Sequence, residues 1–153
     1  MEIRPYKDSD EAAVAALWRE AFGAPAHNVP AEDIRRKLAV QRELFFVAAE
    51  GGEVVGTAMA GYDGHRGWVY YVAVKPSRRR RSVGAALMAR AEDELRARGC
   101  PKLNLQVRAG NREAVAFYEA LGYVVEDRVS MAKRLELLGP AAPPRGEGRG
   151  PKG

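Results

Sequence analysis

Hydrophobic residues recur every three or four positions in several stretches of the chain, and this spacing predicts helices. One helix follows Asp8 and Glu11, which offer a capping pair, and others cover about 82–98 and begin near Asn111. The segment after Pro30 fits a further helix, or a loop with one helical piece. The positions expected to be buried on these helices are Val14, Leu17, Trp18, Ala21, Phe22, Ile34, Leu38, Val83, Leu87, Ala91, Leu95, Ala114, Phe117, Tyr118 and Leu121.

Other stretches are continuously apolar or alternate between apolar and polar residues, which indicates strands. A Gly51-Gly52 turn joins two of these strands into a hairpin. Gly122 ends the helix that begins near Asn111, and the last expected strand follows it. The order β-α-α-β-β-β-α-β-α-β predicts an α/β (α+β) fold with a mixed, mostly antiparallel central sheet and helices on both faces. The expected strands are 2–6, 44–50, 54–61, 68–74, 103–108 and 123–135.

An arginine run stands where the strand ending at Val74 gives way to the helix that begins near Ser82. The first turn of a helix carries partial positive charge, so arginines are unfavourable there unless an anion binds. Free N–H groups and guanidinium groups at one point suit a phosphate or pyrophosphate. The small residues Gly84 and Ala85 would let such a ligand approach the backbone closely.

Two other interpretations of the run from Arg78 to Arg81 are a solvated basic face and a nucleic-acid or targeting patch. The flanking apolar positions favour a fixed corner over a loose basic segment. The net charge is +5, and the tail supplies two of these charges because Arg145, Arg149 and Lys152 stand against Glu147. The remaining net charge of three is too small to require a polyanionic partner, so we do not expect nucleic acid to be one.

Length and composition fit one domain over 1–137 and a disordered Pro/Gly-rich tail over 138–153, in a chain of 153 residues with 46% hydrophobic and 29% charged residues. No apolar run is long enough to span a membrane, and the start Glu2-Ile3-Arg4 is unlike a secretory leader, so we expect a cytoplasmic protein. Cys100 is the only cysteine, which excludes an internal disulfide and a cysteine-based metal cluster; we expect no metal.

Two motifs, together with the element order, resemble the GNAT superfamily of acetyl-CoA-dependent N-acetyltransferases. The first is V-x-P-x-x-R-x-x-[G]-x-G, and the second is N-x-x-A-x-x-x-Y-x-x-x-G-[FY]. Shorter pieces around 56–67 and 97–102 look more narrowly like the bacterial YpeA-type branch. The residues that match the two motifs are Val74, Pro76, Arg79, Gly84 and Leu87, then Asn111, Ala114, Tyr118, Gly122 and Tyr123.

The resemblance implies that the protein binds acetyl-CoA mainly through its backbone. The strand end would hydrogen-bond the pantetheine arm and polarise the thioester carbonyl, and the N–H groups from Arg79 to Ala85 would hold the pyrophosphate. Ser82 stands where the family usually has a glycine, and serine reaches positive φ less easily. The expected cofactor-binding residues are Val72, Ala73, Val74, Arg79, Arg80, Arg81, Ser82, Val83, Gly84, Ala85 and Asn111.

Two residues of the second motif have both a functional and a structural interpretation. Tyr118 matches the family's general acid, which would protonate the leaving coenzyme A thiolate, although its spacing also fits a core tyrosine. Asn111 matches a contact to the cofactor arm and is equally a good helix N-cap.

The general base is not evident in the sequence. Relatives that acetylate protein N-termini carry a glutamate where this chain has Gln106, and the turn residues Asp63 and His65 fit ordinary turn chemistry better than catalysis. The resemblance implies acetyl transfer to a primary amine of a small molecule or protein. We expect the transfer to be direct, because Cys100 precedes a proline in a turn and has no evident partner base for an acetyl-cysteine intermediate. A homodimer is compatible with this fold. A catalytically weak acyl-CoA-binding sensor and a nucleic-acid-binding module are the alternatives.

Overall fold

The computed structural model describes residues 1–23, 29–80 and 82–136. They fall into two compact units, Met1–Tyr123 and the described part of Val124–Gly153, and each unit is described by itself. The helices and strands all lie in the first unit. They are β1 (Glu2–Pro5), a 3-10 turn (Asp8–Asp10), α1 (Glu11–Phe22), α2 (Pro30–Leu38), a 3-10 turn (Arg42–Leu44), β2 (Phe45–Glu50), β3 (Glu53–Tyr62), β4 (Gly67–Val74), a 3-10 turn (Pro76–Arg78), α3 (Val83–Ala97), β5 (Leu103–Asn104) and α4 (Arg112–Ala120).

The five strands form one sheet in the order β1-β2-β3-β4-β5. The first four strands are antiparallel neighbours, and β5 pairs with β4 in parallel. The helix α3 makes the crossover between β4 and β5, as a parallel pair requires. The predicted mixed, mostly antiparallel sheet is therefore confirmed.

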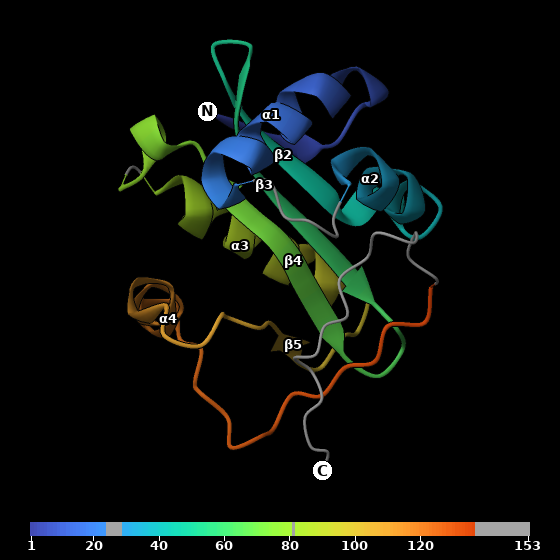
Figure 1. Cartoon of the computed structure of the whole chain (residues 1–153), viewed down its shortest axis with the longest axis vertical. Coiled ribbons are helices and arrows are strands. Elements are labelled where there is room, and N and C mark those ends of the chain that lie inside the picture. Colours follow the sequence, from blue (N-terminus) through green and yellow to red (C-terminus); the bar gives the residue numbers. More distant parts are fainter. Residues whose placement is uncertain (24–28, 81, 137–153) are drawn as a thin grey trace. The chain divides into compact units, whose positions relative to one another are not determined.

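Each face of the sheet is covered by helices and has its own apolar core. In Figure 1, α1 and α2 lie in front of the sheet and α3 lies behind it. The core under α1 and α2 contains Trp18, Ile34 and Phe45, and the core under α3 contains Phe46 and Leu87. Phe45 and Phe46 are adjacent and both fully buried, because successive residues of a central strand point to opposite faces.

The predicted helix after Pro30 is present, with Ile34 buried, and the Gly51-Gly52 hairpin is present with both glycines at positive φ. The predicted capping pair of Asp8 and Glu11 is wrong. Asp10 accepts the Lys7 N–H at 2.8 Å instead. Its carboxylate is fixed there by Arg4, whose hydrogen bond lowers the pKa of Asp10.

The predicted strand over 103–108 ends after two residues, although the exposure of residues 105–108 still alternates. The predicted strand over 123–135 is wrong, because the described residues of the second unit contain no strand. Asp127 and Lys133 interrupt the apolar alternation in this segment. The apolar side chains of that alternation are all exposed, and none of these residues lies in a strand: Val125, Val129, Met131 and Leu135. A segment becomes a strand only where a neighbouring strand pairs with it.

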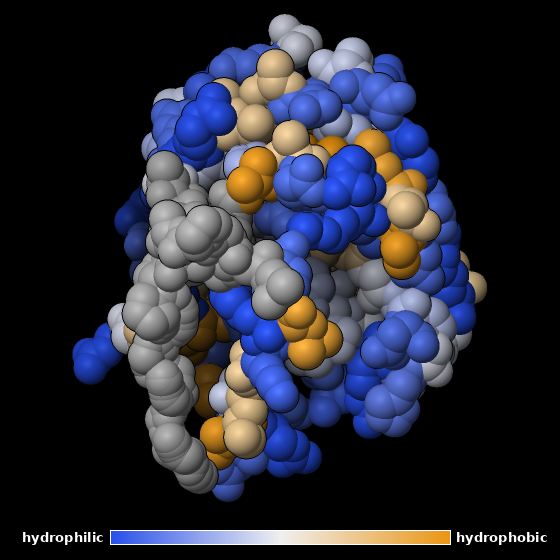
Figure 2. All heavy atoms as spheres, turned by 45° about the vertical axis from the view of Figure 1, so that its right-hand side comes forward, coloured by the Kyte–Doolittle hydropathy of each residue, from blue (hydrophilic) through white to orange (hydrophobic). Residues whose placement is uncertain are grey.

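The surface is mainly hydrophilic on the face drawn in Figure 2, where hydrophobic side chains form several small groups. Among the described residues, no helix is both long enough and apolar enough to cross a membrane. The tail over 138–153 lies outside the described residues.

Gly56 of β3 lies directly against α3, and we expect Gly56→Ala to destabilise the fold. A Cβ atom there would lie 2.9 Å from Leu87 Cδ1, 2.9 Å from Val83 Cγ1 and 3.0 Å from the Ala73 carbonyl oxygen. The free energy of unfolding in urea should fall by about 1–3 kcal/mol.

The matched control is Gly61→Ala on the same strand, because its Cβ would meet only side-chain atoms of Gln41 and Lys37, each at 3.5 Å. Its unfolding free energy should stay within about 1 kcal/mol of wild type. Equal effects of the two substitutions would contradict the close packing of α3 on β3.

Candidate active site

The strands β4 and β5 separate soon after they meet. They pair only at Gly67 with Leu103 and at Trp68 with Asn104. Beyond Trp68, β4 continues to Val74 with no described strand on that side, and Figure 1 shows the chain after β5 leading away towards α4. An unpaired strand edge presents backbone donors and acceptors that an extended ligand can bind.

The open edge of β4 carries the three strand residues that the sequence assigned to cofactor binding. The side chains of Val72 and Val74 pack towards the α3 core, and Ala73 is buried in the core on the other face. Their side chains are therefore used in packing. A ligand at this edge would be bound through the main chain.

A β-bulge bends β4 within this open stretch. Met59 is paired with Tyr70 and Thr57 with Ala73, so Tyr71 and Val72 both stand opposite Ala58. Tyr71 has φ of 52°, which is an unusual and costly value for a bulky residue. No sequence pattern indicates the bulge, because residues 69–74 are continuously apolar or aromatic.

The side chain of Tyr71 is held on both sides. Its ring stacks on Trp18 of α1 with 3.7 Å between ring centroids, and its hydroxyl donates to the Asp33 carboxylate of α2. Burial, followed by this hydrogen bond, raises the pKa of Tyr71. Tyr71 therefore stays a neutral donor, and it connects β4 to both helices of that face.

The backbone enters the left-handed region just before α3 begins. Arg80 and Ser82 are both at positive φ, 68° and 65°, and α3 begins at Val83. The first turn of α3 contains no acidic residue, so its N–H groups and dipole have no acidic side chain to offset them. Ser82 therefore occupies a left-handed conformation that glycine adopts more easily than serine.

The described arginines of the run have two different environments. Arg78 is bound to Glu50 at 2.8 Å and to Glu53 at 3.4 Å, so it ties the start of the corner to the β2–β3 hairpin. Arg79 and Arg80 are exposed and have no ion-pair partner among the described residues. Arg81 lies outside the described residues. The run is therefore not a uniform basic patch, which weakens the nucleic-acid interpretation.

Gly84 brings α3, α4 and β4 together. A Cβ atom at Gly84 would lie 2.9 Å from Phe117 Cζ and 3.6 Å from Val74 Cγ2. The space that the sequence assigned to an approaching ligand is thus occupied by the Phe117 ring. Ala85, the next residue, is only partly buried.

Tyr118 follows Phe117 and packs against the α3 core. Its ring makes edge contacts with Phe117 and Tyr123, with centroids 4.9 Å and 5.8 Å away. Burial raises the pKa of Tyr118 to about 12. Because of this raised pKa, the phenol is protonated at neutral pH. No described residue is hydrogen-bonded to its hydroxyl.

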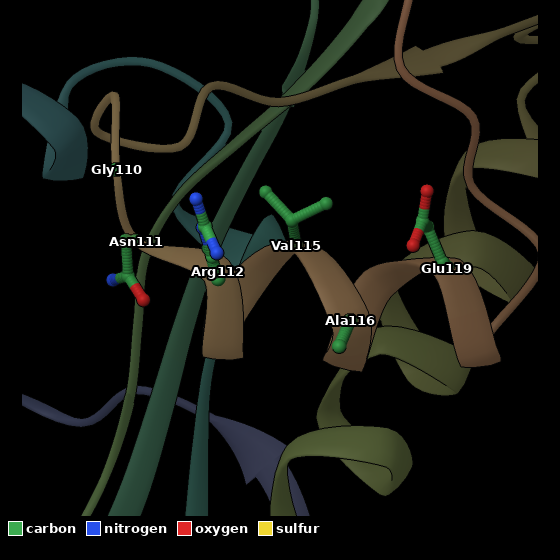
Figure 3. A pocket seen from close by; sticks show the side chains of 6 residues that line it. All are labelled: Gly110, Asn111, Arg112, Val115, Ala116 and Glu119. Atoms are coloured by element: carbon green, nitrogen blue, oxygen red, sulfur yellow. The ribbon is translucent and has the colours of Figure 1, made fainter.

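The N-cap interpretation of Asn111 is confirmed, since its Oδ1 accepts the Ala114 N–H at 3.1 Å. A cavity of about 270 Å³ lies beside this cap. Figure 3 shows the side chains that line it along α4, which include Arg112, Val115, Ala116 and Glu119. These residues lie on the side of α4 opposite Phe117 and Tyr118, so this cavity does not face the phenol.

Several other polar residues have structural roles. Asp63 accepts the N–H groups of His65 and Arg66 at 2.8 Å each, and the bonds from Arg66 and then His65 lower the pKa of Asp63. The turn interpretation of Asp63 is thus confirmed. The Cys100 thiol lies against Gly67 and donates to the Lys102 carbonyl. Among the described residues, no group of side chains is arranged to hold a metal ion.

The acetyltransferase (GNAT) family model matches residues 12–123, which include both β4 and Tyr118. The chain belongs to the GNAT acetyltransferase family. A protein of Yersinia enterocolitica named as an acetyltransferase is 46% identical over 135 residues, which cover 88% of this chain and 96% of that protein. An acetyltransferase of Pectobacterium atrosepticum is 45% identical over the same shares of the two chains. The YpeA-type branch stays a prediction.

Solved structures agree on the GNAT fold. The ribosomal-protein-S18-alanine N-acetyltransferase of Escherichia coli superposes with a TM-score of 0.68 and 28% identity, over 79% of this chain and 76% of that one. The aminoglycoside acetyltransferase AAC(6')-Iy, in complex with a coenzyme A bisubstrate analogue, has a TM-score of 0.73 and 20% identity, over 88% and 97% of the two chains. These relatives have different acceptors, so the family alone does not identify the acceptor here.

We expect Ser82→Gly to stabilise the protein. A non-glycine residue in the left-handed region costs about 1–2 kcal/mol, and glycine's extra flexibility in the unfolded chain offsets part of the gain. The free energy of unfolding should therefore rise by about 0.5–1 kcal/mol in a urea titration.

Ser77→Gly is the control, because Ser77 is exposed in the 3-10 turn before the corner and is not at positive φ. It should leave stability unchanged or lower it. A loss of stability in Ser82→Gly would show that the left-handed backbone at residue 82 is not strained.

Proposed function

We propose that this chain transfers an acetyl group from acetyl-CoA to a primary amine, by direct attack while both substrates are bound. The observation that carries the proposal is the edge of β4 that β5 leaves open after Trp68, which runs to Val74 beside the start of α3. This places an open strand edge next to the first-turn N–H groups of α3 and to Arg79 and Arg80, which have no ion-pair partner in the part of the chain that the structure describes. One substrate with an amide-bearing arm and a pyrophosphate matches both features.

The residues of the corner would bind the cofactor in two parts. The first-turn N–H groups of α3 and the guanidinium groups of Arg79 and Arg80 fit the pyrophosphate, and the open edge at Val72–Val74 fits the arm. Ser82 supports the pyrophosphate site through its left-handed backbone, since its side chain makes no capping bond. Arg81 stays a prediction from the sequence.

Tyr118 is proposed as the general acid. During transfer the amine nitrogen bonds to the acetyl carbon, the carbon–sulfur bond breaks, and the amine gives up a proton to water. Tyr118 would give its phenol proton to the departing sulfur. The raised pKa keeps that proton on the oxygen at neutral pH, and the absence of a described hydrogen-bond partner leaves the proton available.

We expect Tyr118→Phe to lower kcat by about 100-fold with the best acceptor from a screen of amines and peptides, measured as release of coenzyme A thiol. Affinity for acetyl-CoA should stay within about twofold, because the phenol is not part of the proposed binding corner. Tyr62→Phe is the control, since the Tyr62 hydroxyl makes only a 3.4 Å bond to the Gly64 carbonyl.

An unchanged kcat in Tyr118→Phe would remove Tyr118 from the mechanism. If the wild-type protein binds acetyl-CoA but transfers its acetyl group to none of the amines, the chain is an acyl-CoA sensor and the proposed transferase activity is wrong.

The pKa of Tyr118 also predicts the alkaline side of the pH profile. The active form is the protonated phenol, and its pKa lies at about 12, above the usual value of 10. Loss of this proton should therefore not reduce kcat below about pH 11. In saturating amine, kcat should stay level within about twofold from pH 8 to pH 10, whereas a fall in kcat with a midpoint near pH 9 would contradict the assignment.

A further inference from the structure

Thr57 of β3 is fully buried, and its hydroxyl forms a hydrogen bond with the backbone of the β4 bulge. It donates from Oγ1 to the Tyr71 carbonyl at 2.8 Å and accepts the Trp18 Nε1–H at 2.9 Å. Because the indole can only donate, the Thr57 hydroxyl proton must point to Tyr71. The direction of this short chain of bonds, from α1 through β3 to β4, is therefore fixed.

The bond from Thr57 also determines where the next backbone N–H points. A trans peptide is planar, and its C=O and N–H point in opposite directions. The Tyr71 carbonyl is drawn towards Thr57 on β3, so the N–H of Val72 points away from β3. That direction leads to the edge of β4 from which β5 has already separated.

The conformation that produces this orientation is strained and needs support. Tyr71 has φ of 52°, and such a conformation persists only where the surroundings fix it. Three contacts do so: the Thr57 hydroxyl holds the carbonyl, the Trp18 ring stacks on the Tyr71 ring, and Asp33 binds the Tyr71 hydroxyl. Trp18 supports both the ring and the carbonyl of Tyr71, because it stacks on the ring and its indole N–H donates to the Thr57 hydroxyl that binds the carbonyl.

We infer that Thr57 is a positioning residue, which with Trp18 locks the Tyr71–Val72 peptide so that the Val72 N–H faces the open edge and meets the acyl carbonyl of the bound thioester. The role in polarising that carbonyl rests on the proposed function. The orientation of the Val72 N–H does not. Thr57 itself touches neither the thioester nor the acceptor in this role.

Amide hydrogen exchange in the ligand-free protein tests the orientation by NMR. The Val72 amide should exchange at least tenfold faster than the amide of Val47, which lies between β1 and β3 and is paired with Arg4 and Thr57. Equally slow exchange at Val72 would overturn the inference, whatever the protein binds.

Infrared spectroscopy of acetyl-CoA labelled with carbon-13 at the carbonyl tests the role in binding. On the wild-type protein the carbonyl stretch should lie at lower frequency than in solution, because a hydrogen bond polarises it. Thr57→Val keeps the shape but removes the hydroxyl, so the stretch should return towards its solution value and kcat should fall at least tenfold. The Kd for free coenzyme A should stay within about twofold, because the pyrophosphate corner is unchanged.

Thr57→Ser is the rescue variant, and it should restore both the frequency and kcat. Trp18→Phe keeps an aromatic ring against Tyr71 but removes the indole N–H, and it should shift the frequency in the same direction as Thr57→Val, by less. A folded Thr57→Val protein with wild-type frequency and kcat would overturn the inference. If the wild-type protein binds no acetyl-CoA, the proposed function fails, and the exchange rate of Val72 still decides the orientation.

Discussion

The left-handed backbone of Tyr71 is the constraint on which the geometry of the site depends. One extra residue in β4 opposite Ala58 bends the strand and places Tyr71 in a region that L-residues rarely occupy. Contacts from three other elements hold it there: Trp18 from α1, Asp33 from α2 and Thr57 from β3. The core on the α1 side is thereby coupled to the strand edge that would receive the substrate.

Consecutive arginines before the start of α3 differ in their ion pairing. Arg78 is neutralised by Glu50 and Glu53 and serves the fold, whereas Arg79 and Arg80 project without a described ion-pair partner next to a helix start that lacks acidic residues. A helix dipole and two free guanidinium groups repel one another until an anion is bound. In the proposed function, a bound pyrophosphate would relieve this local cost.

The sequence predicted most elements because burial and periodicity agree in them. Ile34, Leu87 and Leu95 are buried as their helical spacing predicted. The bulge at Tyr71 could not be predicted, since it depends on Thr57 and Trp18, which are distant in sequence. The capping by Asp10 depends on the nearby side chain of Arg4, which binds the Asp10 carboxylate and which no capping pattern includes.

Strand pairing was the least predictable feature. Residues 105–108 keep the alternation of a strand but have no ladder, and the segment 123–135 has strand-forming residues but forms no strand in its described part. In both cases the local pattern was present and the partner was not. Gly84 also shows that a local pattern does not identify the partner. The sequence shows that residue 84 is small, but it does not show that the Phe117 ring fills the space beside it.

Calorimetric titration with acetyl-CoA, free coenzyme A and adenosine diphosphate tests the central claim most directly. If the corner between β4 and α3 binds the pyrophosphate and the open edge binds the arm, acetyl-CoA and coenzyme A should both saturate the protein at one site. Adenosine diphosphate should compete for that site with lower affinity, because it lacks the arm. An absence of saturable binding by acetyl-CoA would contradict the account.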